Sequence, residues 1–314
     1  MVPDSQSRHF AFIVNPKAGK GRWASLEPLV RRAFDNPPAG CTGEIILTTH
    51  GGHATGLAAE LAARYGSRLV AIACGGDGTA NEVANGIAGT PAAMGILPIG
   101  TANDFTHAAL SRQDPAEIIS CIYAPDIRPI DVFRVDDRIC LNITSLGFDS
   151  KVQRWATVMN TRARWLGGLA YPLAIFFSLL GGREYPMHFR LDTLDGQGKP
   201  DTAEGDARFI LAAICNGRYY GGGFNPAPNA RLDDGRLDFC LVDALPLRRV
   251  LPLIPLYKQG RHLGDPAVHC LQITGGHIEA PAGQLLLGNY DGELFEKQAI
   301  DFRILPQALR FAFY

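Results

Sequence analysis

A glycine-rich stretch, Gly75-Gly76-Asp77-Gly78-Thr79, has the residue types that bind a phosphate group. It follows the apolar run Leu69–Ala73, which predicts a strand buried on both faces, and it precedes apolar residues at helical spacing. Glycines let backbone N–H groups approach a ligand, and a helix N-terminus adds unpaired donors. Asp77 would repel a bare phosphate, but it can hold a divalent metal ion that bridges to one. Alternatively, the stretch is only a turn between strand and helix.

The helix after this turn has an N-terminal signal of its own. Thr79 and Glu82 have the spacing of a capping box, which predicts that the helix begins there.

A second strand is followed by a similar set of polar residues. The strand is predicted over Met94–Ile99, and after it come Gly100, Thr101, Asn103 and Asp104. Parallel sheets bind ligands at the carboxyl ends of their strands. We therefore expect Asp104 near Asp77, although Asn103 or Asp104 could instead only cap the next helix.

The first strand, Phe10–Val14, leads into a loop with two lysines and two glycines, Asn15 to Gly21. Gly19-x-Gly21-x-x-Ala24 is an imperfect dinucleotide-binding fingerprint, which alone would suggest a dehydrogenase. The second strand, Glu44–Thr49, lacks an acidic residue at its carboxyl end to hold a ribose. The oxidoreductase interpretation is therefore the weaker one.

Strands and helices alternate up to about Tyr123, which predicts an N-terminal parallel α/β domain. After a boundary at Pro125–Pro129, strand-like segments are separated by glycine and Asp-Gly turns, which predicts an antiparallel β-sandwich. The segments are 130–135, 139–143, 187–194, 209–215, 237–242, 268–273, 284–287 and 300–314.

Two helical stretches interrupt the second domain. Trp165–Leu180 is strongly apolar and could contact a membrane or line a lipid cleft, although a core helix is equally consistent with its pattern. Leu245–Gln259 could present a basic face to anionic headgroups, but a solvated face is the simpler interpretation. The first stretch is flanked by Arg162, Arg164 and Arg183. The second contains Arg248, Arg249 and Lys258.

Composition narrows the class of protein. The chain has 314 residues, which suits two domains, and a net charge of −1, which gives a nucleic-acid partner no electrostatic support. The seven cysteines show no C-x-x-C spacing and are expected to be reduced. No signal-peptide pattern and no apolar stretch of about twenty residues is found, so a cytoplasmic protein without a transmembrane span is expected.

The motifs together resemble those of the diacylglycerol kinase catalytic-domain family, which includes bacterial lipid kinases and sphingosine kinases. Gly75–Thr79 is similar to the nucleotide-binding signature, Gly100–Phe105 to the second hallmark, and Asp291-Gly292-Glu293 to the third. The run before Asp291, Gly288-Asn289-Tyr290, is less apolar than is usual in the family. NAD kinases and phosphofructokinases carry a relative of the first motif, which alone therefore indicates only a phosphoryl-transfer superfamily.

The resemblance implies ATP and Mg²⁺ as cofactors and assigns roles to residues. Asp77 and Asp104 would position the Mg²⁺ of Mg-ATP, Asp291 would accept the proton of a lipid hydroxyl, and Glu293 would orient it or share the metal. The residues expected at ATP are Asn15, Lys17, Gly19, Lys20, Thr49, Gly75, Gly76, Asp77, Gly78, Thr79, Gly100, Thr101 and Asn103.

The run from Asn225 to Gly235 is similar to a family element that holds a structural Mg²⁺ in some members. Asp233 and Asp234 are the candidate ligands. Asn229 stands where an aspartate is common, and a neutral amide is a poorer Mg²⁺ ligand, which argues against this ion here.

We therefore expect an ATP-dependent lipid kinase acting on diacylglycerol or a related lipid at the inner face of the membrane. Residues 1–127 would bind the nucleotide, 128–299 the lipid, and 300–314 would return to the first domain. A homodimer is compatible with the sequence. The alternatives are a soluble NAD kinase-like phosphotransferase, an NAD(P)-dependent oxidoreductase at Gly19–Ala24, and a non-catalytic lipid-binding module, which would leave Asp77 and Asp291 without a purpose.

Overall fold

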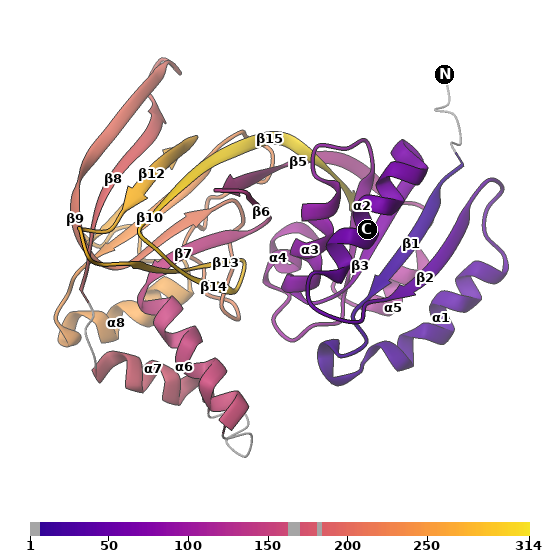
Figure 1. Cartoon of the computed structure of the whole chain (residues 1–314), viewed down its shortest axis with the longest axis horizontal. Helices are drawn as coiled ribbons and strands as arrows, with labels where there is room; N and C mark the ends of the chain where they lie inside the picture. Colours follow the sequence, from indigo (N-terminus) through magenta and orange to yellow (C-terminus); the bar gives the residue numbers. More distant parts are fainter. Residues whose placement is uncertain (1–6, 163–169, 181–183) are drawn as a thin grey trace. The chain divides into compact units, whose positions relative to one another are not determined.

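The computed structural model describes residues 7–162, 170–180 and 184–314, which form two compact units (Figure 1). Unit 1 comprises the described residues up to Val132, together with Leu232–Asp234 and Leu305–Tyr314. Unit 2 comprises the described residues of Phe133–Arg231 and Gly235–Ile304. Trp165, Arg164 and Arg183 lie outside the described residues, so the predicted helix 165–180 is seen as α7, Ala170–Leu180.

Unit 1 is built on the predicted parallel sheet. Its strands are β1 (His9–Val14), β2 (Thr42–Leu47), β3 (Leu69–Gly75) and β4 (Ala93–Pro98), in the order β2-β1-β3-β4. The C-terminal part of β15 (Ala299–Phe313) pairs with β4, also in parallel. Every residue of β1, β3 and β4 is buried, as continuous apolar runs predict.

Helices cover both faces of this sheet (Figure 1). α2 (His53–Tyr65) and α3 (Asp77–Ile87) pack together on one face, and α1 (Trp23–Asp35) packs with α5 (Pro115–Ser120) on the other. The short helix α4 (Asp104–Ala109) follows β4. Two 3₁₀ turns, Ala18–Lys20 and Gly66–Arg68, complete the unit.

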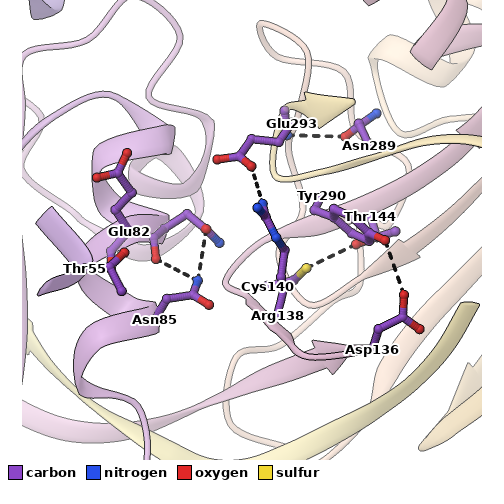
Figure 2. Close-up of polar contacts among 12 residues, drawn as sticks. Thr55, Glu82, Asn85, Asp136, Arg138, Cys140, Thr144, Asn289, Tyr290 and Glu293 are labelled. Carbon is purple, nitrogen blue, oxygen red and sulfur yellow. Dashed lines mark hydrogen bonds and ion pairs between the residues drawn. The ribbon is translucent and has the colours of Figure 1, made fainter. Parts of the chain in front are cut away.

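The predicted capping box of α3 is wrong. The helix begins at Asp77 with Gly76 as its N-cap, so Thr79 lies inside the first turn and is buried. The Glu82 carboxylate instead accepts the backbone N–H of Ala54 at 3.1 Å, at the start of α2. Thr55 of α2 donates its hydroxyl to the Glu82 carbonyl at 3.0 Å (Figure 2). Glu82 therefore caps the neighbouring helix rather than its own.

Unit 2 is antiparallel, as predicted. Its strand order is β14-β13-β7-β9-β8-β12-β15, and β10 and β11 extend from β9. The strands are β5 (Asp126–Val135, entering from unit 1), β6 (Arg138–Cys140), β7 (Ile143–Gly147), β8 (Tyr185–Leu194), β9 (Pro200–Cys215), β10 (Leu237–Asp243), β11 (Val268–Ile273), β12 (Gly275–Glu279), β13 (Leu286–Tyr290) and β14 (Glu293–Lys297). Two of these, β12 and β14, are absent from the sequence-based prediction because they are short and rich in glycine or charge.

Three helices pack against the strands of unit 2 on one side (Figure 1). They are α6 (Phe148–Arg162), α7 and α8 (Leu247–Lys258). α8 matches the predicted helix, whereas α6 was not predicted. Among the helices of the described ranges, none combines the length and the apolar character needed to span a bilayer.

Candidate active site

The phosphate-binding loops predicted in unit 1 meet at the carboxyl ends of β1, β3 and β4. A Cβ on Gly100 would lie 2.3 Å from the Gly76 Cα, and a Cβ on Gly19 would lie 1.9 Å from the Ile99 carbonyl oxygen. The N–H groups of Ile99 and Gly100 both donate to the Gly75 carbonyl, at 3.1 and 3.0 Å. This close backbone approach leaves no room for larger residues, so the three loops form one glycine-lined cradle.

Asp77 and Asp104 begin two helices beside the cradle. Asp77 opens α3, and its Oδ1 accepts the Phe105 N–H at 3.1 Å in the first turn of α4. Asp104 opens α4 and is buried. The predicted metal ligands are thus linked through α4, and both present carboxylates near helix N-termini.

Asn103 contributes an unusual polar group to the same loop. Its backbone is left-handed, with φ 54°, and its Nδ2 donates to the Gly100 carbonyl at 3.0 Å. Its Oδ1 is buried without a hydrogen-bond partner among the described residues. An unsatisfied buried acceptor is costly, so Asn103 Oδ1 is a candidate acceptor at this site.

The other residues predicted to bind the nucleotide lie around the cradle. The Asn15 N–H donates to Cys74 O at 2.9 Å, and Asn15 Oδ1 accepts the Lys17 N–H at 3.0 Å, which shapes the first loop. Thr49 Oγ1 lies 3.2 Å from His53 Nδ1 at the start of α2. The side chains exposed to solvent are Lys17, Lys20, Thr49 and Thr101.

In unit 2, Asp291 and Gly292 form the two-residue turn between β13 and β14. Tyr290 pairs with Glu293 across this hairpin, and both turn residues have positive φ, 44° and 94°. Asp-Gly suits such a type I′ turn. The Asp291 carboxylate accepts three backbone N–H groups, from Leu141 at 2.6 Å, Asn142 at 3.0 Å and Ile143 at 2.8 Å.

These hydrogen bonds explain why the predicted continuous strand 139–143 is wrong. The N–H groups of Leu141 and Asn142 donate to Asp291, and the strand divides into β6 and β7 around them.

A network that the sequence analysis missed fixes the Asp291 turn. The buried Asn289 accepts the Gly292 N–H through Oδ1 at 3.3 Å, and its Nδ2 donates to Ser145 Oγ at 2.5 Å and Ser150 Oγ at 3.1 Å. Gln153 of α6 donates to the Gly292 carbonyl. The unusual polarity of Gly288-Asn289-Tyr290 was the available signal for this network.

The predicted second acidic residue, Glu293, forms an ion pair with Arg138 of β6 (Figure 2). Both side chains are about half exposed. Figure 2 also shows Thr144 beside Cys140, and Tyr290 beside Asp136 on the turn before β6. Arg138 could not be recognised from the sequence because its partner is far along the chain.

Asp233 and Asp234 lie on a turn assigned to unit 1. The preceding Leu232 carbonyl accepts the N–H of Asp131 at 2.6 Å, and the buried Asp131 carboxylate accepts the Gln307 N–H at 2.7 Å. Asn229 is exposed.

Unit 2 also contains an apolar cavity with an empty volume of about 730 Å³, including its opening to solvent. Its walls come from α6, α7, β9, β10, α8 and the loop at Tyr220. The apolar lining residues are Phe148, Val152, Ile175, Ile210, Leu211, Tyr220, Phe224, Val242, Val250, Leu253, Ile254 and Tyr257. One carboxylate, Asp149, lines the same cavity.

Asp149 is held at the first turn of α6, where its Oδ1 accepts the Ser150 N–H at 2.8 Å. Burial raises the pKa of Asp149 to about 6, and hydrogen bonds from Ser145, Ser150 and Tyr220 oppose that rise. Asp149 therefore titrates close to physiological pH in an otherwise apolar pocket.

A parallel α/β unit with a glycine cradle, joined to an antiparallel unit, defines the class of two-unit phosphotransferase folds that the sequence predicts. Residues 9–135 match the diacylglycerol kinase catalytic domain, and residues 142–313 match the YegS C-terminal NAD kinase beta sandwich-like domain. The chain therefore belongs to the diacylglycerol kinase catalytic-domain family of lipid kinases, in its YegS-like branch, which confirms the predicted family.

Individual relatives agree with this assignment. The chain is 34% identical over 293 residues to "Probable lipid kinase YegS-like" of Pseudomonas aeruginosa, covering 92% of this chain and 91% of that protein. The Pseudomonas fluorescens protein of the same name is 34% identical over 290 residues, covering 91% and 89%. A crystal structure of a diacylglycerol kinase from Bacillus anthracis has the same fold, with a TM-score of 0.68, 22% identity, and coverage of 98% and 97%.

Proposed function

We propose that this protein is an ATP-dependent kinase that transfers the γ-phosphate to a hydroxyl group of diacylglycerol or a related lipid. Family membership supports kinase chemistry. The observation that carries the choice of acceptor is the apolar cavity of unit 2, whose lining is mostly hydrophobic and includes one charged residue, Asp149. A fatty acyl chain fits such a lining, whereas a soluble dinucleotide such as NAD would leave its polar groups unsatisfied there.

The glycine cradle of unit 1 is the proposed ATP phosphate site. At Gly19 and Gly100 the loops approach each other so closely that only glycine fits. The cradle lies at the N-terminus of α3, where backbone N–H groups can bind a phosphate. Lys17 and Lys20 are exposed and add positive charge, and Asn103 Oδ1 offers an acceptor for a nucleotide donor group. We assign Thr49 and Thr101 to the periphery of the same site.

The donor set of Asp77 and Asp104 fits Mg²⁺, because this ion prefers carboxylate oxygens and substrate phosphates. When bound, the ion would supply charge neutralisation for the phosphates. Asp233 and Asp234 support a structural ion less well, because Asn229 stands where an aspartate is common and a neutral amide is a poorer Mg²⁺ ligand.

Asp291 is the proposed general base. Three backbone N–H groups, from Leu141, Asn142 and Ile143, hold its carboxylate in a fixed orientation. These hydrogen bonds weaken the base. Phosphoryl transfer depends mainly on positioning and charge stabilisation, so a weak base in a fixed position suffices. Glu293, paired with Arg138, would orient the acceptor.

We propose that the protein works at the inner face of the membrane, in the cytoplasm. Exposed aromatic side chains on α6 and α7 support contact with lipid: Trp155, Phe176 and Phe177 are 41%, 55% and 44% exposed. Trp155 and Phe177 lie next to each other, with ring centroids 6.0 Å apart. Trp and Phe side chains are typical of the apolar face of a helix that lies in the membrane interface.

The test is transfer of labelled γ-phosphate from Mg-ATP to a panel of lipids in mixed micelles, with NAD included as a soluble acceptor. Label on diacylglycerol or a related lipid is the expected result and identifies the acceptor. Label on NAD alone would contradict the proposal and move the protein to the soluble branch of the superfamily. Absence of label, with ATP bound, would also contradict it.

A further inference from the structure

Three side chains that can bind a metal ion meet at an edge of the sheet in unit 2. Cys240 on β10 and Cys270 on β11 are directly opposite each other in the antiparallel register. His262 follows α8 and packs on Tyr257 of that helix, with ring centroids 4.6 Å apart. One donor atom of each residue lies within 4.8 Å of the other two. None of the three belongs to the proposed kinase site.

The spacing suits tetrahedral coordination. Cys240 Sγ lies 3.7 Å from His262 Nε2. With Zn–S of about 2.3 Å and Zn–N of about 2.0–2.1 Å, tetrahedral geometry places a sulfur and a nitrogen ligand about 3.5 Å apart and two sulfurs about 3.8 Å apart. Small side-chain adjustments therefore bring the donor atoms to coordination distance. His262 Nε2 also lies 3.1 Å from the Pro226 carbonyl, a contact that an ion would replace.

Exposure gives an ion a route to these donors. Cys240 and His262 are buried, whereas Cys270 is exposed on β11, which pairs only with β10 among the described strands. An ion can approach from solvent beside Cys270 and then reach the two buried donors. Three protein ligands leave one tetrahedral position for water.

We propose that Cys240, His262 and Cys270 form a binding site for a thiophilic metal ion of the Zn²⁺ class, with one coordination position open to solvent. The ion would connect β10, the edge strand β11 and the segment after α8. Leu253 and Tyr257 of α8 line the apolar cavity, so metal binding would stabilise one wall of that cavity.

The test is a Co²⁺ titration of the full-length protein, stripped of metal and kept reduced with a non-thiol reductant. The expected result is one equivalent bound, with the strong visible absorption of tetrahedral Co²⁺ and ultraviolet thiolate-to-metal bands, both removed by Zn²⁺. The exposed Cys270→Ser substitution should weaken binding by at least about tenfold. Cys41→Ser, at a partly exposed cysteine of unit 1, is the matched control and should bind like the parent.

A second readout is thermal. Zn²⁺ should raise the melting temperature of the parent and of Cys41→Ser, but not that of Cys270→Ser. The proposal is overturned if the parent shows no thiolate-to-metal band, if Cys270→Ser binds as tightly as the parent, or if thiol counting reveals a Cys240–Cys270 disulfide that persists under reductant. None of these measurements uses kinase activity, so the metal-site proposal can fail or succeed independently of the proposed function.

Discussion

At the scale of single residues, the Asp291 carboxylate is a group whose two roles can be separated by experiment. Replacement by Asn keeps the size and removes the basic carboxylate. If Asp291 is the general base, turnover should fall by about 10²- to 10⁴-fold while lipid binding persists. The measurement is kcat for lipid phosphorylation beside vesicle or micelle binding.

The exposed Asp201→Asn variant on β9 is the control and should keep parental turnover. Asp291→Asn also weakens the hydrogen bonds to residues 141–143, so its urea unfolding must be measured in parallel. A folded Asp291→Asn protein with full turnover would contradict the base assignment.

The glycines of the cradle give a second residue-scale prediction. Gly100→Ala places a Cβ 2.3 Å from the Gly76 Cα, whereas a Cβ at Gly78 meets nothing within 4 Å. Gly100→Ala should therefore lower the free energy of unfolding by about 1–3 kcal/mol, the usual cost of overpacking. Gly78→Ala should leave stability close to that of the parent. Equal stability of the two variants in urea unfolding would show that the backbone at Gly76 and Gly100 can move apart to accommodate a Cβ.

Asp149 makes stability depend on pH. Its pKa is raised from 3.8 to about 6 in the folded protein, so the folded state disfavours the ionised carboxylate. The unfavourable contribution is absent below about pH 4, grows between about pH 4 and 6, and is complete above pH 6. Each tenfold change in the acid dissociation constant on folding corresponds to about 1.4 kcal/mol of stability.

The Asp149→Asn variant should therefore gain stability over the parent as pH rises through this window and lose that advantage below pH 4. The measurement is the difference in unfolding free energy between the two proteins across pH. A difference that does not change with pH would contradict a buried, titrating Asp149.

At the scale of elements, the helix pair α6–α7 presents the exposed aromatic side chains. Phe176→Ser with Phe177→Ser removes two exposed rings without touching the cavity lining. Because burying a Phe side chain contributes about 1.5–3 kcal/mol, affinity for vesicles should fall at least about tenfold. The measurement is vesicle co-sedimentation.

Leu285→Ser is the control for α6–α7, since Leu285 is 58% exposed on a loop elsewhere in unit 2. Equal loss of vesicle binding in the control would show that contact with lipid does not depend on these helices.

At the scale of the whole molecule, the two units are proposed to bind different substrates. Leu253→Phe, in the cavity wall of α8, should raise the KM for a long-chain lipid and shift preference toward shorter chains. The KM for ATP should not change, because the cradle lies in unit 1. Leu251→Phe, on the exposed side of α8, is the matched control and should behave like the parent. An equal effect on the KM for ATP would contradict the proposal that unit 1 binds ATP and unit 2 binds the lipid.

Local features of the chain allowed much of unit 1 to be predicted. The apolar run Leu69–Ala73 is followed closely by the glycines of the phosphate-binding stretch. When such a run is buried as a strand of a parallel sheet, the loop after it lies at the edge of the sheet where ligands bind. The capping box failed because Glu82 caps α2, a partner that sequence spacing does not reveal. Strands β12 and β14 were missed because pairing, rather than apolar pattern, holds them in place.

The sequence by itself determined the family, the order of the strand-and-loop motifs, and the identity of the acidic and glycine residues at the proposed kinase site. Only the tertiary structure decided what surrounds them. The N–H partners of Asp291 lie about 150 residues earlier in the chain. Strand register brings Cys240 opposite Cys270, and the segment after α8 brings His262 to them. The cavity around Asp149 is assembled from three helices, two strands and the loop at Tyr220. Such contacts join distant segments, and their spacing along the chain follows no period that a sequence pattern could display.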